Sequence, residues 1–206
     1  MTSAYSEDDQ RMIRLQEGDR TAFEELMSEW RNPLHRFFLR STRDVTQTED
    51  LLQDTFLRLY RNSWDYVPTG RFRGWLFRIA NNLLVDHTRR ARRDVLLSAV
   101  RKYTFSDGDL VDSISLLQTR ENSPFRKVAQ QEEAMIIGDL IDQLPDVQRR
   151  TFLLHYYESL SLSEVAEAME TSLPTTKGRL RLAKEKLRES LTARGFSPEM
   201  INDEDE

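Results

Sequence analysis

The sequence predicts an all-α protein made of two small helical domains joined by a flexible linker. Charged residues make up 32% of the chain and apolar residues 38%, with only seven Gly and six Pro, a balance typical of helical proteins. Apolar residues recur at three- and four-residue intervals in both halves, but turn residues replace this periodicity between about Asp94 and Gln131. We therefore expect an N-terminal domain over residues 1–95, a linker over 96–131, a C-terminal domain over 132–196 and an acidic tail over 197–206.

Four or five helices are predicted in the N-terminal domain. The first runs from Ser6 to Gln16 and stops before Gly18. Capping boxes, in which a hydroxyl side chain and a Glu three residues later satisfy the first backbone amides, predict the next two helix starts. These pairs are Thr21 with Glu24 and Thr46 with Glu49. Pro33 is expected to kink or split the first of these two helices.

A further helix, from Phe72 to about Arg93, closes the domain. Its apolar residues at core spacing are Phe72, Trp75, Leu76, Ile79 and Leu83. A loop from Trp64 to Arg71, containing Pro68 and Gly70, precedes it, and Tyr66 on this loop is the aromatic ring that we expect to contact a base.

The C-terminal domain contains the pattern of a helix-turn-helix. Ser161 and Glu164 form a third capping box before a helix of about eight residues, and residues 170–172 supply a turn. Ser172 can cap the next helix, in whose first turn the missing N–H of Pro174 costs nothing. A short helix, a tight turn and a longer basic helix are typical of a module that places its second helix in the DNA major groove.

The second helix of this module has an apolar stripe and a neighbouring basic stripe. Thr176, Leu180, Ala183, Leu187 and Leu191 recur at core spacing, and Lys177, Arg181, Lys184 and Arg188 are spaced four, three and four residues apart. Basic side chains in such a stripe can reach phosphates and base edges together. A lone basic stripe is more often an ordinary solvated face, but the preceding capped helix and turn favour DNA binding.

Charge is strongly segregated along a chain whose formal net charge is −5. Residues 71–93 hold seven Arg and one acid, and residues 175–194 hold seven Lys or Arg and two acids, whereas ten acids face five bases over residues 94–147. Such local fields, and not the net charge, steer an approaching polyanion. Arg78, Asn82, Arg89 and Arg93 share one face of the first basic helix, where nearby aromatic rings suit unstacked DNA; the rings of Phe72 and Trp75 are better explained as core.

Several function classes are disfavoured by the residue inventory. The chain has no Cys, its three His lie on separate predicted helices, and it shows no phosphate-binding glycine loop, nucleophile elbow or zinc motif. We therefore expect no enzymatic activity, no cofactor and no metal. With no signal-peptide pattern and no apolar run of about 20 residues, a cytoplasmic location is expected. Two alternatives remain open: a repressor or activator that binds duplex DNA alone, and a helical module that binds RNA or an acidic protein.

Three motifs in order resemble the extracytoplasmic-function sigma factors of the sigma-70 family, the promoter-recognition subunits of bacterial RNA polymerase. They are residues 49–58 (EDLLQDTFLR), residues 70–82 (GRFRGWLFRIANN), and residues 160–166 (LSLSEVA) with the basic helix that follows. The likeness covers nearly the whole chain except the linker and the ends.

The resemblance implies three binding surfaces. Core polymerase would meet the chain through its β′ clamp and β flap, the clamp at Asp50, Leu51, Gln53, Asp54 and Leu57. The melted minus-ten element would meet Tyr66, Arg71, Arg78, Asn82, Asp86, Arg89, Arg90 and Arg93. The duplex minus-thirty-five element would meet Thr175, Thr176, Lys177, Gly178, Arg179, Arg181, Lys184 and Arg188. An anti-sigma protein is a further implied partner.

The chain departs from the family pattern at two positions of the basic helix. Leu182 stands where family members commonly carry Arg, and Gly178 replaces the usual Ser. The missing guanidinium and hydroxyl imply that the recognised promoter sequence differs from that of relatives.

Overall fold

The computed structural model describes residues 5–103 and 136–196, with no side-chain detail for Arg92 and for residues 94–103. Every regular element in these ranges is helical. The N-terminal domain contains α1 (Glu7–Gln16), α2 (Arg20–Thr42), α3 (Val45–Arg61), the short turn η1 (Ser63–Asp65) and α4 (Phe72–Tyr103). The C-terminal domain contains a helical segment over residues 136–142, then α6 (Asp146–Phe152), the short π-helix η2 (Leu153–Tyr157), α7 (Leu162–Ala168) and α8 (Leu173–Ala193). The all-α prediction is confirmed; most of the expected linker lies outside the described residues.

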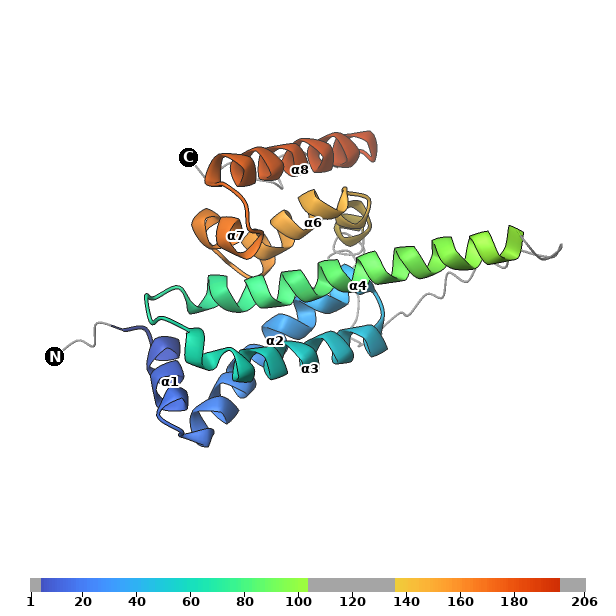
Figure 1. The fold of residues 1–206 in the computed structure, drawn as a ribbon. Coiled ribbons are helices and arrows are strands. Elements are labelled where there is room, and N and C mark those ends of the chain that lie inside the picture. The colour runs from blue at the N-terminus through green and yellow to red at the C-terminus, as the bar shows by residue number, and fades with distance from the viewer. Residues whose placement is uncertain (1–4, 104–135, 197–206) are drawn as a thin grey trace, which may run out of the picture.

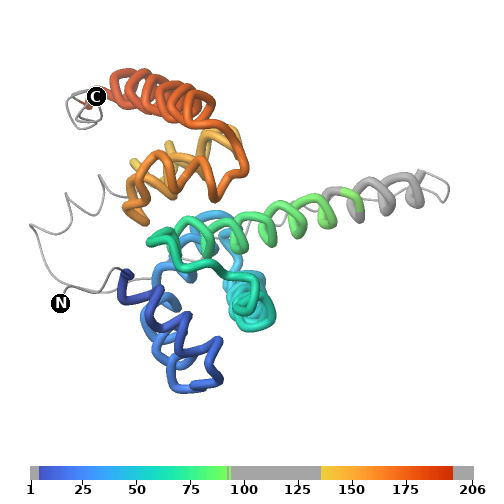
Figure 2. Tube along the Cα trace, turned by 60° about the vertical axis from the view of Figure 1, so that its left-hand side comes forward, coloured from blue at the N-terminus to red at the C-terminus, as the bar shows by residue number. Residues whose placement is uncertain are grey.

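The two domains form two layers in contact (Figure 1). Helices α1, α2 and α3 lie on one side of α4, α6 and α7 lie on its other side, and α8 is the outermost helix of the second layer. Figure 2 shows the same order from another direction, with α4 between the two groups and its C-terminal part extending beyond them. Helix α4 is therefore the element that both domains share.

Aromatic and large aliphatic side chains fill the N-terminal core. Phe37, Phe38, Phe72 and Phe77 are each 1% exposed or less, and ring pairs such as Phe37 with Phe77 meet edge to face at 5.6 Å between centroids. Burying each such side chain contributes roughly 1.5–3 kcal/mol, and the edge-to-face geometry adds a directional preference. A second core, built on Leu180 and its neighbours in α8, belongs to the C-terminal domain alone.

Helix starts in the N-terminal domain differ from the sequence-based prediction. Asp19 caps α2 by accepting from the Thr21 amide at 2.9 Å, and Asp44 caps α3 by accepting from the Gln47 amide at 3.0 Å. The two predicted capping boxes are therefore wrong, because an Asp carboxylate two residues earlier takes the capping position in each case. The start of α1 has a capping box between Ser6 and Asp9.

Two further features correct the predicted helix lengths. Helix α2 runs through Pro33 without a break, so this proline removes one backbone hydrogen bond but does not split the helix. Helix α4 continues to Tyr103, beyond its expected end near Arg93.

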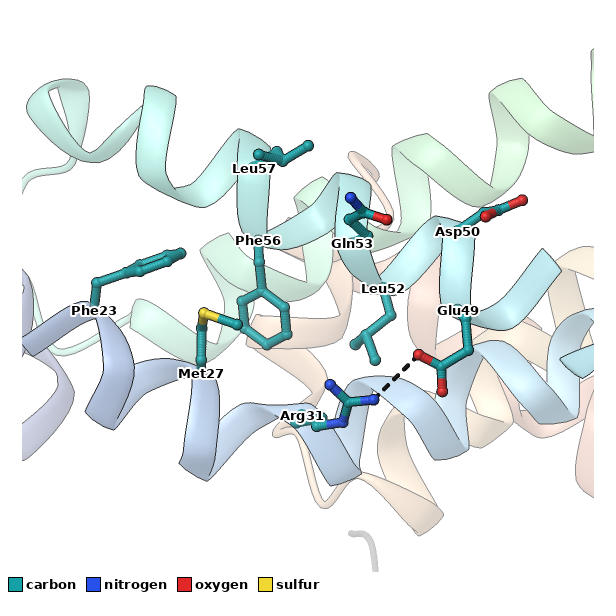
Figure 3. A pocket seen from close by; sticks show the side chains of 9 residues that line it. All are labelled: Phe23, Met27, Arg31, Glu49, Asp50, Leu52, Gln53, Phe56 and Leu57. Carbon is teal, nitrogen blue, oxygen red and sulfur yellow. Dashed lines mark hydrogen bonds and ion pairs between the residues drawn. The ribbon is translucent and has the colours of Figure 1, made fainter. Parts of the chain in front are cut away.

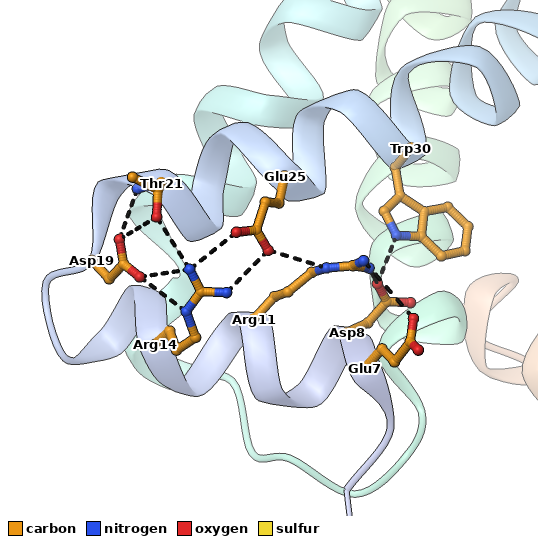
Figure 4. A network of polar contacts seen from close by, with 8 residues as sticks. All are labelled: Glu7, Asp8, Arg11, Arg14, Asp19, Thr21, Glu25 and Trp30. Atoms are coloured by element: carbon orange, nitrogen blue, oxygen red, sulfur yellow. Dashed lines mark hydrogen bonds and ion pairs between the residues drawn. The ribbon is translucent and has the colours of Figure 1, made fainter.

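A network of charged side chains joins α1 to α2 (Figure 4). The Arg14 guanidinium donates to Asp19 at 2.7 Å and to both Glu25 oxygens at 3.0 Å, and Arg11 pairs with Asp8 at 2.9 Å. The hydrogen bond from Thr21, and then the hydrogen bond from Arg14, lower the pKa of Asp19 to about 2. The ionised form of Asp19 is thus the one that the folded chain holds.

The loop between α3 and α4 is anchored by a buried carboxylate. Asp9 is fully buried and accepts hydrogen bonds from the Tyr66 hydroxyl and, at 2.6 Å, from the Gly70 amide. The Tyr66 ring packs against Phe72 and Trp75 and is only 5% exposed. In this arrangement the ring that was expected to contact a base is buried, and its hydroxyl holds the loop to α1.

We expect replacement of Asp19 by Ala to lower the melting temperature at pH 7 but not at about pH 2. The folded-state pKa of Asp19 lies below its ordinary value of 3.8, so its stabilising effect is present above about pH 4 and is lost as the pH falls toward 2. Thermal unfolding followed by circular dichroism across this range measures the effect. Glu24→Ala, an exposed position on the same helix, is the control; equal curves for the two variants would contradict the capping role.

Replacement of Tyr66 by Phe should destabilise the fold by roughly 1–3 kcal/mol, because it removes a donor from the buried Asp9 carboxylate. Urea unfolding measures the change. Tyr60→Phe removes a hydroxyl from a ring that is 47% exposed and should have little effect. Equal stabilities for both variants would show that the Asp9 bond does not anchor the loop.

Candidate nucleic-acid and polymerase interfaces

The helix-turn-helix forms as the sequence predicts. Ser161 and Glu164 make a reciprocal capping box at the start of α7, and the Ser172 hydroxyl accepts from the Thr175 amide at 3.3 Å at the start of α8. Glu170, with φ of 48°, adopts the left-handed conformation in the turn between them. After the turn, α8 lies on the outer side of α6 and α7, as Figure 1 shows.

One face of α8 is packed and another faces solvent. Leu180, Ala183, Leu187 and Leu191 are buried in the second core. On the open face, Thr175, Lys177 and Arg181 are exposed, and Arg181 pairs with Glu185 at 2.5 Å. Gly178 has open space where a side chain would stand, and Leu182 is 41% exposed. This open face offers cations, a hydroxyl and a bare backbone position to a groove.

Three residues of the expected minus-thirty-five set lie elsewhere. Thr176 is fully buried and its hydroxyl donates to the Ser172 carbonyl oxygen at 3.2 Å. Lys184 is 6% exposed, with its ammonium nitrogen 5.2 Å from the centroid of the Tyr156 ring. Arg179 lines a cavity that faces α4. Positions 176 and 184 lie three or four residues from the buried positions 180 and 187, so they fall on the core side of α8. Arg188, the eighth member of the set, is partly buried.

Most of the expected minus-ten residues lie along α4, and Arg71 directly precedes it. Arg71, Arg89, Arg90 and Arg93 are exposed, whereas Arg78, Asn82 and Asp86 are partly buried. The Asn82 amide donates to Glu170 Oε1 at 3.2 Å, and the neighbouring Asn81 accepts from Arg150 at 2.8 Å. The structure thus brings most of the predicted row to one helix but places its centre against the C-terminal domain.

A polar cavity of about 550 Å³ lies at this contact. Its wall carries four guanidinium groups, those of Arg58, Arg89, Arg150 and Arg179, together with the two asparagines, Asp86 and Glu170. Burial lowers the pKa of Arg150, and the positive charges of Arg149, Arg179 and Arg89 add to this effect while Asp146 opposes it. The cavity is therefore electropositive and suited to an anionic group.

The expected polymerase face lies beside a groove between α2 and α3 (Figure 3). Apolar side chains line this cavity of about 340 Å³, and an ion pair between Arg31 and Glu49 at 3.2 Å lies at its edge. Asp50, Gln53, Asp54 and Leu57 are exposed along α3. Leu51 is 3% exposed, so it supports the surface from within and cannot touch a partner.

Sequence reasoning missed the contribution of α2 to this groove. Phe23 and Met27 are partly buried and line it opposite Phe56 and Leu57. Their spacing of four residues predicts buried core positions and not a groove. Trp64, one of the aromatic residues before α4 that suit unstacked DNA, is 69% exposed at η1.

Among the described residues, no group of three or more His, Cys, Asp or Glu is placed so that it could hold a metal ion. No helix among them is both long and apolar enough to cross a bilayer.

Comparisons with known proteins assign both domains. A family model described as Sigma-70 region 2 matches residues 26–94, and one described as Sigma-70, region 4 matches residues 134–187. The chain is 32% identical over 176 residues to the ECF RNA polymerase sigma factor SigM of Bacillus subtilis, covering 85% of this chain and 98% of that protein. It is 29% identical over 181 residues to SigW of the same organism, covering 88% and 95%.

Two solved structures share the fold. CnrH, solved with the cytosolic domain of CnrY, aligns with a TM-score of 0.63 at 23% identity over 91% of this chain and 99% of that one. RpoE of Bartonella quintana, solved with the anti-sigma factor NepR, aligns with a TM-score of 0.63 at 20% identity over 82% and 96%. At these identities the likeness concerns the fold alone. Two sigma-70 domains in order, and relatives matched over nearly their whole length, show that this chain belongs to the extracytoplasmic-function RNA polymerase sigma factors, which are transcription-initiation factors and not enzymes.

Proposed function

We propose that the chain acts in the cytoplasm by binding core RNA polymerase through α3 and reading a promoter through two separate helices. The observation that carries this proposal is the separation of surfaces: acidic and amide side chains with an apolar groove on α3, and basic side chains on α4 and α8. Charge complementarity increases the rate and specificity of association with a basic partner, whereas basic helices attract phosphates. One chain can therefore bind a protein and DNA at the same time.

For the duplex minus-thirty-five element, the open face of α8 is the proposed reader. Lys177 and Arg181 lie one helical turn apart on this face and are both exposed. An Arg or Lys in the major groove can pair with guanine, and the same side chains can neutralise phosphates. Gly178 lets the backbone approach the DNA closely, while Leu182 offers an apolar contact of the kind that suits a thymine methyl group.

For the melted minus-ten element, α4 is the proposed reader. Asn82 can donate and accept hydrogen bonds, so it can pair with the edge of an unstacked base. Exposed Arg89, Arg90 and Arg93 continue along the same helix, where they can hold the backbone of the strand. Tyr66 stiffens the adjoining loop from within.

We also propose an anti-sigma protein as a regulatory partner. The two structures with the shared fold were solved with partners, the cytosolic domain of CnrY and the anti-sigma factor NepR. The groove between α2 and α3 adds apolar area to the proposed polymerase surface, and a competing protein would have most effect there.

Run-off transcription with purified core polymerase tests the proposed activity. Promoter-dependent transcripts should require this chain, and DNA binding should depend strongly on core. A gel shift of duplex DNA by the chain alone, with no transcripts on a genome-wide template library, would instead indicate a stand-alone repressor.

Replacing Lys177 and Arg181 together by Ala should weaken promoter use about tenfold or more while leaving core affinity unchanged, since a good base contact is worth roughly 1–3 kcal/mol. Asp50→Ala with Gln53→Ala should do the reverse. Transcript yield and fluorescence anisotropy of core binding measure the two effects. Lys186→Ala and Glu29→Ala, exposed positions outside both surfaces, are the matched controls. A loss of core affinity in the α8 variant equal to that in the α3 variant would refute this division.

Asn82→Ala should impair melting of the minus-ten element without weakening core binding, because the neighbouring amide on α4, that of Asn81, is 4% exposed and is taken by Arg150. Permanganate reactivity of promoter thymines measures the opening. Asn32→Ala, an exposed amide on α2, is the control. Unchanged reactivity in the Asn82 variant would show that this side chain does not hold a base.

A further inference from the structure

Four arginines from four different helices line the polar cavity between the two domains. Arg58 comes from α3 and Arg89 from α4, whereas Arg150 comes from α6 and Arg179 from α8. Each domain therefore supplies two of the four guanidinium groups. The cavity shares no residue with the groove between α2 and α3, so it is a separate site.

The charges on the cavity wall do not balance. The wall carries four guanidinium groups and two carboxylates, those of Asp86 and Glu170, which leaves an excess of two positive charges. Three of the arginines form no ion pair with any side chain that the structure describes: Arg58, Arg89 and Arg179. Like charges that are close together and partly removed from water repel one another. An anion in the cavity would relieve this repulsion.

The fourth guanidinium, that of Arg150, is held in a fixed direction. Its Nη1 donates to Asn81 Oδ1 at 2.8 Å, and its Nε donates to the Asp146 carbonyl oxygen at 3.3 Å. Asn81 is itself only 4% exposed, and burial lowers the pKa of Arg150. A guanidinium that is already oriented loses little conformational entropy when it binds a ligand. A neighbouring anion would also compensate for the hydration that burial has removed.

A second cavity, of about 320 Å³, adjoins the first. The residues common to both walls are Val85, Arg89, Val147 and Arg150. The second wall adds Leu84 and the hydroxyl groups of Ser41 and Thr88. Each hydroxyl donates its hydrogen to a backbone carbonyl oxygen, so its own oxygen can still accept a hydrogen bond. Apolar and hydroxyl groups beside a cluster of cations suit a ligand with an uncharged part joined to a charged one.

Linked phosphate groups are the anions that fit these features. A guanidinium presents its N–H groups as a planar fork that matches two phosphate oxygens. The first cavity, of about 550 Å³, lies within the range of about 300–1,000 Å³ that is typical of small-molecule sites, so it can hold more than one phosphate. A single carboxylate carries one negative charge, which is less than the excess on the wall, whereas a diphosphate or triphosphate carries at least two.

We propose that the cavity between α3, α4, α6 and α8 is an effector site for a small molecule that carries two or more linked phosphate groups. The four arginines bind the phosphates, and the adjoining cavity receives any sugar or base attached to them. Arg89 also belongs to the proposed minus-ten surface, so a bound oligophosphate would compete with the minus-ten strand. This consequence rests on the proposed function, but binding of the oligophosphate itself does not.

Isothermal titration calorimetry of the full chain with sodium tripolyphosphate tests the site. We expect saturable binding of one ligand per chain, and much weaker binding of sodium sulfate, which has only one tetrahedral group. ATP and GTP are titrated in parallel. Tighter binding of a nucleotide would identify nucleotides as the source of the phosphates, and equal or weaker binding would identify an inorganic phosphate chain. Absence of saturable binding by all three oligophosphates would overturn the proposal.

Single substitutions in the two domains locate the bound ligand. Arg58→Gln and Arg179→Gln should each lower the affinity for tripolyphosphate about tenfold, because each removes a charge-assisted hydrogen bond. Arg61→Gln on α3 and Lys186→Gln on α8, at exposed positions outside the cavity, remove the same charge and should have little effect. A loss confined to the Arg179 variant would place the anion on α8 alone, and equal losses in the controls would indicate unspecific attraction. Either result would overturn the proposal.

Thermal unfolding without ligand separates a loss of binding from a loss of structure. The melting temperatures of the Arg58 and Arg179 variants should not fall, because each substitution removes a repulsion between like charges. Tripolyphosphate should raise the melting temperature of the unaltered chain as its concentration increases, and this rise should be smaller in both variants. An equal rise in all three proteins would contradict the site. These measurements need neither polymerase nor promoter, so their outcome is independent of transcription activity.

Discussion

The packing of α4 against both domains is the constraint on which the rest of the structure depends. Buried positions on this helix include Ile79, Ala80, Asn81, Leu83 and Leu84. Consecutive residues on a helix point about 100° apart, so these positions cannot share one face. The first layer of helices covers one side and α7 covers another. A helix buried on two sides is open to solvent mainly in its second half, where Arg89, Arg90 and Arg93 are exposed.

This double burial also explains what sequence analysis could and could not find. The apolar spacing of Phe72, Leu76 and Leu83 predicts the face toward the N-terminal core, and this part is confirmed. Ala80 and Gly74 carry too little side chain to indicate a second buried face, although a Cβ added at Gly74 would lie 3.5 Å from Glu164 of α7. Contacts between domains that lie far apart in the sequence leave no periodic signal.

The site residues show the same limit at the level of single side chains. Residue type and spacing correctly predicted the positions of the two helices of the helix-turn-helix and of their caps, and Lys177 and Arg181 are exposed on the second helix. They could not show that Lys184 turns under the helix beside Tyr156, or that the Tyr66 hydroxyl is taken by Asp9. Basic residues are usually exposed and aromatic residues on loops can be, so both are predicted at the surface from residue type. The side chains that bury them here come from segments far away in the sequence.

Charged side chains act in opposite directions where the two domains meet. Arg36 forms an ion pair with the Glu158 carboxylate, and Arg73 donates to the Glu158 backbone carbonyl oxygen. Three other arginines line the electropositive cavity and form no ion pair with any described residue: Arg58, Arg89 and Arg179. Repulsion between these arginines opposes the packing of the two domains, whereas apolar contacts and the ion pair between Arg36 and Glu158 favour it. Because these contributions have opposite signs, the net free energy of packing the two domains together is smaller than the buried surface alone implies. The arginines around the cavity can therefore still gain electrostatic energy from an anionic group.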